Sequence, residues 1–431
     1  MPFPDYEASL SHTIGVVKSP TQTEAAPDFT DRARANMPFD SILDLLSGRQ
    51  RDDTFTNILL QTKVDLAYAA LSKLVSAASK YTDGIADWFN QAAPTVQQRL
   101  LASADFSHLI PIINQVREYP ALVECAHQLK LIVAKLKISM GLFDDGDTNY
   151  LLGHNCGHFT SPFGDKLIEI DAHNSWRIIP SPTVGLTLSL DFDSDLAQQC
   201  DEASAVFGLP LLRWQGNEKQ RVQDKLNQAL SMIDVAAPHL GRLIRNFVRR
   251  IFIRKTVLLD ENGKTIGVTR VTSEYLPRYP GTISVSNIHI PECSIVFLME
   301  TILHESIHNV MNCFEDKYGD FMPDDNFYRP ASPWSGNLIP NHALAHAVFV
   351  YYGCVTLLRL CIAKNVCSND TDAGEAKRRV SSILSGFFVS KSISELFLTQ
   401  PIGHEDLYRA IDAMQESVER SCYPYVRDIS L

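Results

Sequence analysis

The segment LMETILHESIHNVMN carries two histidines four residues apart, His304 and His308, with Glu305 directly after the first. The chain from Cys293 to Phe314 has no glycine or proline and is rich in apolar residues, so we expect a helix. Positions four apart share one helical face, which lets both imidazoles reach one metal ion. The alternative interpretation is a solvent-exposed helix, but the residues that flank the motif are too apolar for such a helix.

A catalytic metal needs a third protein ligand besides two histidines. The segment LIPNHALAHAVFVYYG offers His342 and His346, again four apart and surrounded by apolar residues. The two histidine pairs therefore predict a metal site between two helices. The acids of Glu315–Asp325 are competing third ligands, although this polar stretch contains glycine and proline and its acids are expected to be solvated.

Three segments, YPGTISVSNIHI, METILHESIHNVM and YRPASPWSGNLIPNHALAHAVFVYYG, occur in this order. Together they resemble the HExxH-type 2-oxoglutarate-dependent peptide β-hydroxylases of ribosomal peptide natural-product pathways. The resemblance covers mainly residues 275–360. It implies that His304, His308 and His346 bind Fe(II), and that His342 lies beside the cofactor without binding the iron.

One position departs from that family. Ser335 follows the Pro-Trp pair at 333–334, where the family usually has arginine. The distal carboxylate of 2-oxoglutarate needs a cation, and arginine suits it because it can pair with both oxygens. Arg329 is the only arginine between residues 278 and 359, so it is the candidate replacement. An arginine on a surface loop is the alternative interpretation of Arg329.

The resemblance implies an Fe(II)- and 2-oxoglutarate-dependent oxygenase, which uses dioxygen to hydroxylate an unactivated carbon. The substrate would be the β-carbon of an amino-acid residue in a peptide, with a free amino acid or a carrier-bound small molecule as open alternatives. Three imidazoles on the iron leave three positions for the 2-oxo acid and dioxygen. Glu305 would then orient a ligand or solvent and would not be needed as a base.

The rival interpretation is a zinc metallopeptidase, in which His304 and His308 bind Zn²⁺ and Glu305 activates the bound water. Its third ligand would be His346 or a downstream acid. HESIH is not followed by the glycine and histidine of the metzincin pattern. Imidazole suits iron and zinc alike, so ligand type does not separate the two metals. A metal-binding protein without catalysis is the third alternative.

Two other motifs have metal-ligand residue types. GHNCGH offers His154, Cys156 and His158 without a fourth ligand, so a glycine-rich loop is favoured over a second metal site. The alternating aspartates of residues 191–195 lack the glycine and distal glutamate of a calcium loop, so we expect a solvated turn.

The densest basic cluster is expected on a solvated helix face. An acidic leader peptide or carrier protein docked on that face is the alternative. The cluster consists of Arg245, Arg249, Arg250, Arg254 and Lys255.

The composition is that of a folded, acidic chain. Of the 431 residues 45% are hydrophobic and 21% are charged, and the net charge is −11. These values exclude wholesale disorder and give no overall basic surface for nucleic acid or anionic membranes. The sequence shows no signal peptide and no run of about 18 apolar residues, and its nine cysteines include no CxxC pair. We therefore expect a cytoplasmic protein with reduced thiols, whose partners are a peptide or small molecule.

Hydrophobic periodicity predicts the elements that position these residues. The expected fold class is α+β and mainly α-helical, with an irregular N-terminal arm (1–50), a helical N-terminal region (51–140) and an α+β metal-dependent catalytic region (141–431). The expected helices are 56–79, 95–103, 121–138, 218–252 with a break at Pro238, 294–312, 341–362, 373–385 and 404–421. The expected strands are 166–172, 176–179, 184–190 and 282–290, with a hairpin at 255–271 whose Asn262-Gly263 pair suits a type I′ turn.

Overall fold

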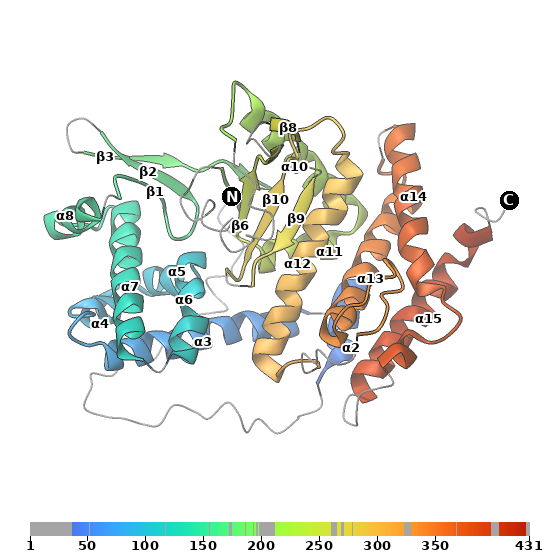
Figure 1. Cartoon of the computed structure of the whole chain (residues 1–431), viewed down its shortest axis with the longest axis horizontal. Helices are drawn as coiled ribbons and strands as arrows, with labels where there is room; N and C mark the ends of the chain where they lie inside the picture. Colours follow the sequence, from blue (N-terminus) through green and yellow to red (C-terminus); the bar gives the residue numbers. More distant parts are fainter. Residues whose placement is uncertain are drawn as a thin grey trace.

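The computed structural model shows an α+β protein that is mainly α-helical, which is the fold class predicted from the sequence (Figure 1). It describes residues 37–50, 52–116, 118–154, 156–171, 175–185, 187–192, 194, 197, 212–259, 265–268, 271–277, 279–322, 329–367, 369–397 and 405–427. A group of N-terminal helices, two principal sheets and a group of C-terminal helices make up this part of the chain.

Most of the N-terminal helices pack around a core of their own. Their bounds are α3 (Thr54–Ala77), α4 (Ile85–Gln91), α5 (Pro94–Leu101), α6 (Ala104–Gln115), α7 (Tyr119–Met140) and α8 (Asp145–Gly153). Pro94 starts α5, and the Ser103 side chain accepts a hydrogen bond from the Phe106 N–H at the start of α6, so local sequence fixes both starts. The first turns of α3 instead bury Phe55 and Leu59 in the larger core of the molecule. Helix α3 therefore belongs to both cores.

Helix α2 (Phe39–Ser47) lies within the segment that was expected to be an irregular arm, so that expectation is wrong for these residues. Phe39, Ile42, Leu43 and Leu46 are spaced as one apolar helical face and are buried in the larger core. The face is short and flanked by polar residues, so its periodicity is weak in the sequence. The rest of the expected arm, up to residue 36, lies outside the described residues.

Two sheets follow the N-terminal helices. The antiparallel three-stranded sheet has the order β1-β2-β3 and comprises β1 (His158–Thr160), β2 (Lys166–Ile170) and β3 (Trp176–Pro180). The five-stranded sheet has the order β4-β5-β6-β10-β9 and comprises β4 (Thr183–Val184), β5 (Leu188–Asp191), β6 (Arg250–Arg254), β9 (Thr272–Tyr275) and β10 (Thr282–Ser286). Strands β5, β6 and β10 are parallel, whereas β4 and β9 are antiparallel strands at the two edges.

The hairpin expected at 255–271 is present as two paired strands. Strand β7 (Val257–Leu259) pairs antiparallel with β8 (Thr265–Val268). The Asn262-Gly263 turn between them lies outside the described residues.

The long helix expected over 218–252 is only partly correct. It divides at Pro238, as predicted, into α10 (Glu218–Ala236) and α11 (Pro238–Phe247). Beyond Phe247 the expectation is wrong, because residues 250–254 form the central strand β6. All five residues of β6 are buried. A strand buried on both faces shows no alternation of polar and apolar residues, so periodicity does not distinguish it from a buried helix.

The basic cluster does not form a solvated helix face, so that expectation is wrong as well. Arg250 is only 1% exposed and Arg254 only 5%. Arg250 Nη1 donates to Asp105 Oδ1 on α6 at 3.1 Å, and its Nη2 donates to the carbonyl oxygens of Ser161 at 2.9 Å and Pro162 at 3.1 Å. Arg250 therefore links the N-terminal helices, the three-stranded sheet and the five-stranded sheet.

Two other members of the cluster have acidic neighbours. Arg245 pairs with Asp234 and Lys255 pairs with Glu218, and both acids lie on α10.

The prediction of a solvated turn at 191–195 is wrong for Asp191, which is 3% exposed and has a carboxylate oxygen 4.0 Å from Arg250 Nη1. The other two aspartates lie outside the described residues.

The C-terminal helices surround α12. Their bounds are α12 (Ile295–Tyr318), α13 (Asn341–Ala363), α14 (Asp370–Phe387), the short 3₁₀ helix η2 (Ile393–Phe397) and α15 (Glu405–Arg427), so the four helices expected here are confirmed. Helix α12 contacts β9 and β10 on one side and α13 on another, and it also contacts α3, α10, α11 and α14 (Figure 1).

Among the described residues one helix, α13, is long and apolar enough by composition to cross a membrane. However, 67% of its apolar window is buried inside the protein. Its side chains contribute to the same core as those of α2 and α12. Packing within this core accounts for the apolar composition of α13.

Replacing Arg250 with methionine should lower the free energy of unfolding by about 3–5 kcal/mol, because Asp105 and Asp191 would stay buried without their cation. The matched control is Arg49→Met, which removes an exposed pair with Asp44 and should cost less than about 1 kcal/mol. Urea unfolding of both variants measures the difference. Equal losses would show that Arg250 does not hold the three parts together.

Candidate metal centre

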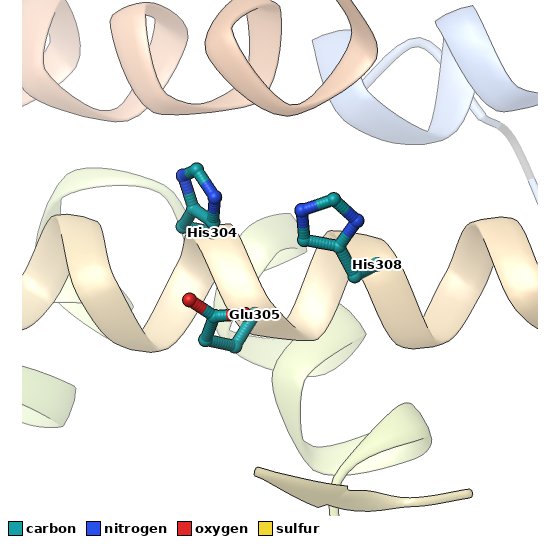
Figure 2. A group of neighbouring side chains, drawn as sticks. All are labelled: His304, Glu305 and His308. Atoms are coloured by element: carbon teal, nitrogen blue, oxygen red, sulfur yellow. The ribbon is translucent and has the colours of Figure 1, made fainter. Parts of the chain in front are cut away.

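Helix α12 carries the HExxH motif, as the sequence predicted. The Ser294 side chain accepts a hydrogen bond from the Phe297 N–H and so caps the start of the helix. His304 and His308 point to the same side of α12, toward α13, whereas Glu305 points to the opposite side (Figure 2). The helix therefore presents imidazoles on one face and a carboxyl group on another.

The face of α12 that carries Glu305 is hydrogen bonded to the five-stranded sheet. Ser273 Oγ on β9 donates to Glu305 Oε1 at 2.5 Å, and the backbone of Tyr275 also hydrogen bonds to this carboxyl group. One turn later, Asn309 Oδ1 accepts a hydrogen bond from the Gly281 N–H at 2.7 Å. Burial raises the pKa of Glu305 to about 7, although both hydrogen bonds lower it. The Glu305 carboxyl group is thus hydrogen bonded to strand β9 of the five-stranded sheet.

His346 on α13 meets the histidines of α12. Its Nδ1 lies 3.5 Å from His308 Nδ1, and the two rings stack at a centroid distance of 5.7 Å. Two nitrogens that bind one ion tetrahedrally at about 2.1 Å lie about 3.4 Å apart. His304 is joined to the group through His308, whose ring centroid is 5.1 Å from its own. The structure therefore places His346 next to His308, but the ligand atoms of the three predicted histidines do not form one group. Among the described residues, His304 and His308 group with Glu305, and His346 groups with Glu315 and His342.

The buried histidines are suited to metal binding by their charge state. Burial lowers the pKa of His304 to about 4. Burial, and then the neighbouring histidines, lower the pKa of His308 well below its usual value. Both rings are therefore neutral at pH 7, which is the form that binds a metal. Neutral imidazoles fit both Fe(II) and Zn²⁺.

Glu315 forms a second group with His342 and His346. Glu315 Oε1 lies 2.7 Å from His342 Nε2, and Oε2 lies 3.2 Å from His346 Nε2. Burial alone would raise the pKa of Glu315, but hydrogen bonds and charge from the two histidines outweigh it and lower the pKa to about 2. The Glu315 side chain is only 10% exposed, so the expectation of a solvated acid is wrong for this residue. Its burial depends on α13, which the local sequence does not show.

The structure places the two residues predicted at the cofactor differently. The His342 ring lies 4.3 Å from the His346 ring between centroids, next to the predicted ligands. Arg329 is exposed in the described segment 329–340 that precedes α13. The three histidines lie deeper, with His346 only 7% exposed.

Aromatic side chains that the sequence did not single out surround the histidines. Tyr275 on β9 stacks on His308 at 5.7 Å, and Tyr351 on α13 meets His304 edge-on at 5.9 Å. Trp334, from the Pro-Trp loop, stacks on Tyr351 at 4.5 Å. These contacts form only in the folded chain, so no spacing rule could have found Tyr275. The aromatic rings shield the histidines from solvent.

The residues of GHNCGH do not gather into a metal-binding group among the described residues. His154 Nδ1 lies at hydrogen-bond distance, 2.8 Å, from the Tyr150 carbonyl oxygen, and His158 begins β1. The segment connects α8 to β1, in agreement with the favoured interpretation of a loop.

Comparison with known proteins leaves the family undefined. No protein-family model matches the chain, and no curated protein matches it significantly. Function is therefore inferred from the residues of the site.

Helices α12 and α13 approach closely where Gly353 faces Ile307. A Cβ atom at position 353 would overlap Ile307 Cδ1 and would lie 3.5 Å from Leu46 Cδ2 of α2. Glycine at this position therefore sets how near the histidines of the two helices can come.

Replacing Gly353 with alanine should lower the free energy of unfolding by about 1–3 kcal/mol, because Ile307 must move, and should weaken divalent-metal binding. Gly374→Ala on α14 is the matched control, since no atom lies within 4 Å of its added Cβ. It should be neutral or stabilise by up to about 1 kcal/mol. Thermal unfolding and chelator competition test both. A Gly353 variant as stable as the control would contradict the close packing.

Proposed function

We propose that the chain is an Fe(II)- and 2-oxoglutarate-dependent oxygenase that hydroxylates an unactivated carbon. The proposed substrate is the β-carbon of an amino-acid residue in a peptide or a related natural-product precursor. The observation that carries this proposal is the division of α12 into two faces. His304 and His308 face α13 on one side, where His346 lies beside His308, and the Glu305 carboxyl group is hydrogen bonded to β9 on the other.

In this proposal His304, His308 and His346 hold Fe(II). The bound iron would supply the activation of dioxygen by 2-oxoglutarate, which yields succinate, carbon dioxide and a hydroxylated substrate. One oxygen atom enters the new hydroxyl group and the other enters succinate, so the reaction balances. Glu305 contributes by fixing α12 to the sheet, which holds the two histidines of the motif in place.

The aromatic side chains around the histidines support the same proposal. Tyr351, which stacks on Trp334, contacts His304, and Tyr275 stacks on His308. An oxidising reaction must be kept from bulk water and directed to the substrate. The resemblance of residues 275–360 to peptide β-hydroxylases adds the substrate class, and a cytoplasmic location with no nucleic-acid or membrane partner belongs to the same proposal.

A zinc metallopeptidase is the second candidate, and one observation favours it. Burial raises the pKa of Glu305 to about 7, which is the range of an efficient general base at neutral pH. The Glu305 carboxyl oxygen also lies within 4.8 Å of the coordinating atoms of His304 and His308. Against this candidate, the hydrogen bonds from β9 already engage the carboxyl group.

Anaerobic addition of Fe(II) and then 2-oxoglutarate should produce a weak charge-transfer band in the visible spectrum, a general property of 2-oxo acids bound to ferrous iron. His346→Ala should abolish the band because it removes an iron ligand. Glu305→Gln should keep the band and lose no more than about 100-fold in metal affinity, since Glu305 acts only through the helix that carries the ligands. His158→Ala, at an exposed histidine of β1, is the matched control and should not change the spectrum.

The two candidates give opposite results with Glu305. Tight Zn²⁺ retention, no charge-transfer band, and peptide cleavage reduced about 100-fold or more by Glu305→Gln would reject the oxygenase and identify a peptidase. A band without succinate release from any peptide, free amino acid or carrier-bound substrate would reject the hydroxylase activity.

A further inference from the structure

We infer that Glu315 is a positioning residue for His346, and that His342 holds Glu315 in place. Together the Glu315–His342 pair would fix which ring nitrogen of His346 faces the metal. This inference rests on the metal centre of the proposed function, but it gives Glu315 and His342 a role that the proposed function does not assign to them.

The two nitrogens of His346 face different neighbours. Nδ1 lies 3.5 Å from His308 Nδ1, on the side of the proposed metal. Nε2 is buried and lies 3.2 Å from Glu315 Oε2, a charge contact without regular hydrogen-bond geometry, and it has no hydrogen-bond partner among the described residues. An imidazole that binds a metal through one nitrogen commonly donates the N–H of the other to a carboxylate. Glu315 therefore favours a proton on Nε2, which leaves the lone pair of Nδ1 free for the metal.

Glu315 is itself held on its other oxygen. Oε1 lies 2.7 Å from His342 Nε2 and accepts a hydrogen bond from the Phe321 N–H at 3.2 Å. These lengths are those of ordinary hydrogen bonds. Both oxygens are thus engaged, and the carboxylate cannot rotate without losing a partner.

The pair links the two helices that make the centre. Glu315 follows His308 by seven residues on α12, and His342 precedes His346 by four residues on α13. Both spacings place the members on one helical face. The contact between Glu315 and His342 therefore joins the helices one to two turns away from the proposed ligands and aligns them.

Charge gives a second reason for a carboxylate at this position. Three neutral imidazoles leave the charge of a divalent ion uncompensated by its ligands. The Glu315 side chain is only 10% exposed, and its carboxylate brings a negative charge next to His346. A buried charge is stable only when it is paired and hydrogen bonded, and Glu315 has hydrogen bonds with His342 and with the Phe321 N–H and a close contact with His346.

The same three side chains also have the residue types of a two-histidine, one-carboxylate metal site, and their ligand atoms lie within 4.8 Å of one another. In that case His346 would be shared between two ions. The two hydrogen bonds to Oε1 of Glu315, and the contact of Oε2 with His346, favour the positioning role over a second ion. Metal stoichiometry separates the two possibilities.

The test uses the full-length chain reconstituted with Zn²⁺ or Co²⁺. The wild-type chain should bind one equivalent. Glu315→Gln should weaken metal affinity by about 10- to 100-fold in chelator competition and change the visible spectrum of the Co²⁺ form. His342→Ala should have a smaller effect in the same direction, and His342→Gln, which keeps an N–H donor, should restore affinity.

Glu300→Gln is the matched control, because Glu300 is also a buried acid of α12 but pairs with Arg379. It should lower the melting temperature of the metal-free chain without changing metal affinity or the Co²⁺ spectrum. Because the His342 side chain is 32% exposed, its variants should fold even if Glu315→Gln does not.

Three outcomes would overturn the inference. Equal affinity in wild type, Glu315→Gln and His342→Ala would remove the positioning role and leave the proposed function intact. Two equivalents in wild type, with one lost in His342→Ala, would identify a second metal site instead. A wild-type chain that binds no metal would overturn the proposed function together with this inference.

Discussion

The close contact between α12 and α13 is the constraint on which the candidate centre depends. Gly353 leaves room for Ile307, so the two helices approach far enough for His308 and His346 to face each other. On its other side α12 is fixed to the sheet through Glu305 and Asn309. The histidines therefore lie between α12 and α13. Apolar packing sets the distance between these helices, and the hydrogen bonds to the sheet set the orientation of α12. Such support fixes ligand geometry before any ion arrives.

Burial then determines which side chains of the centre are charged. The same low-polarity surroundings lower the pKa of His304 and His308 and raise that of Glu305. Glu315 differs, because two imidazoles surround it and lower its pKa to about 2 despite burial. Two glutamates on one helix thus have opposite electrostatic characters. The acid within the HExxH motif is readily protonated, whereas the acid two turns beyond it keeps its charge.

Much of this arrangement could be predicted from local sequence, and the remainder could not. The absence of glycine and proline around His304, together with helical spacing, was enough to predict α12 and its partner helix. Strand β6 was mistaken for helix because a strand buried on both faces has no alternation. The burial of Glu315 and the stacking of Tyr275 depend on α13 and β9, which lie elsewhere in the chain. Contacts between such distant segments leave no pattern in the local sequence.

Helix α2 connects the beginning of the chain to the centre. The Phe39 ring lies 5.2 Å from Phe314 and 5.1 Å from Phe321, and Phe321 lies 5.3 Å from the His346 ring. Helix α2 contacts α11, α13 and α15, so during synthesis its apolar face is not fully covered until the C-terminal helices have left the ribosome. Contacts of such long range are slow to form, and unpaired apolar segments promote aggregation. The apolar face of α2 is thus open to aggregation in the nascent chain until those helices pack against it.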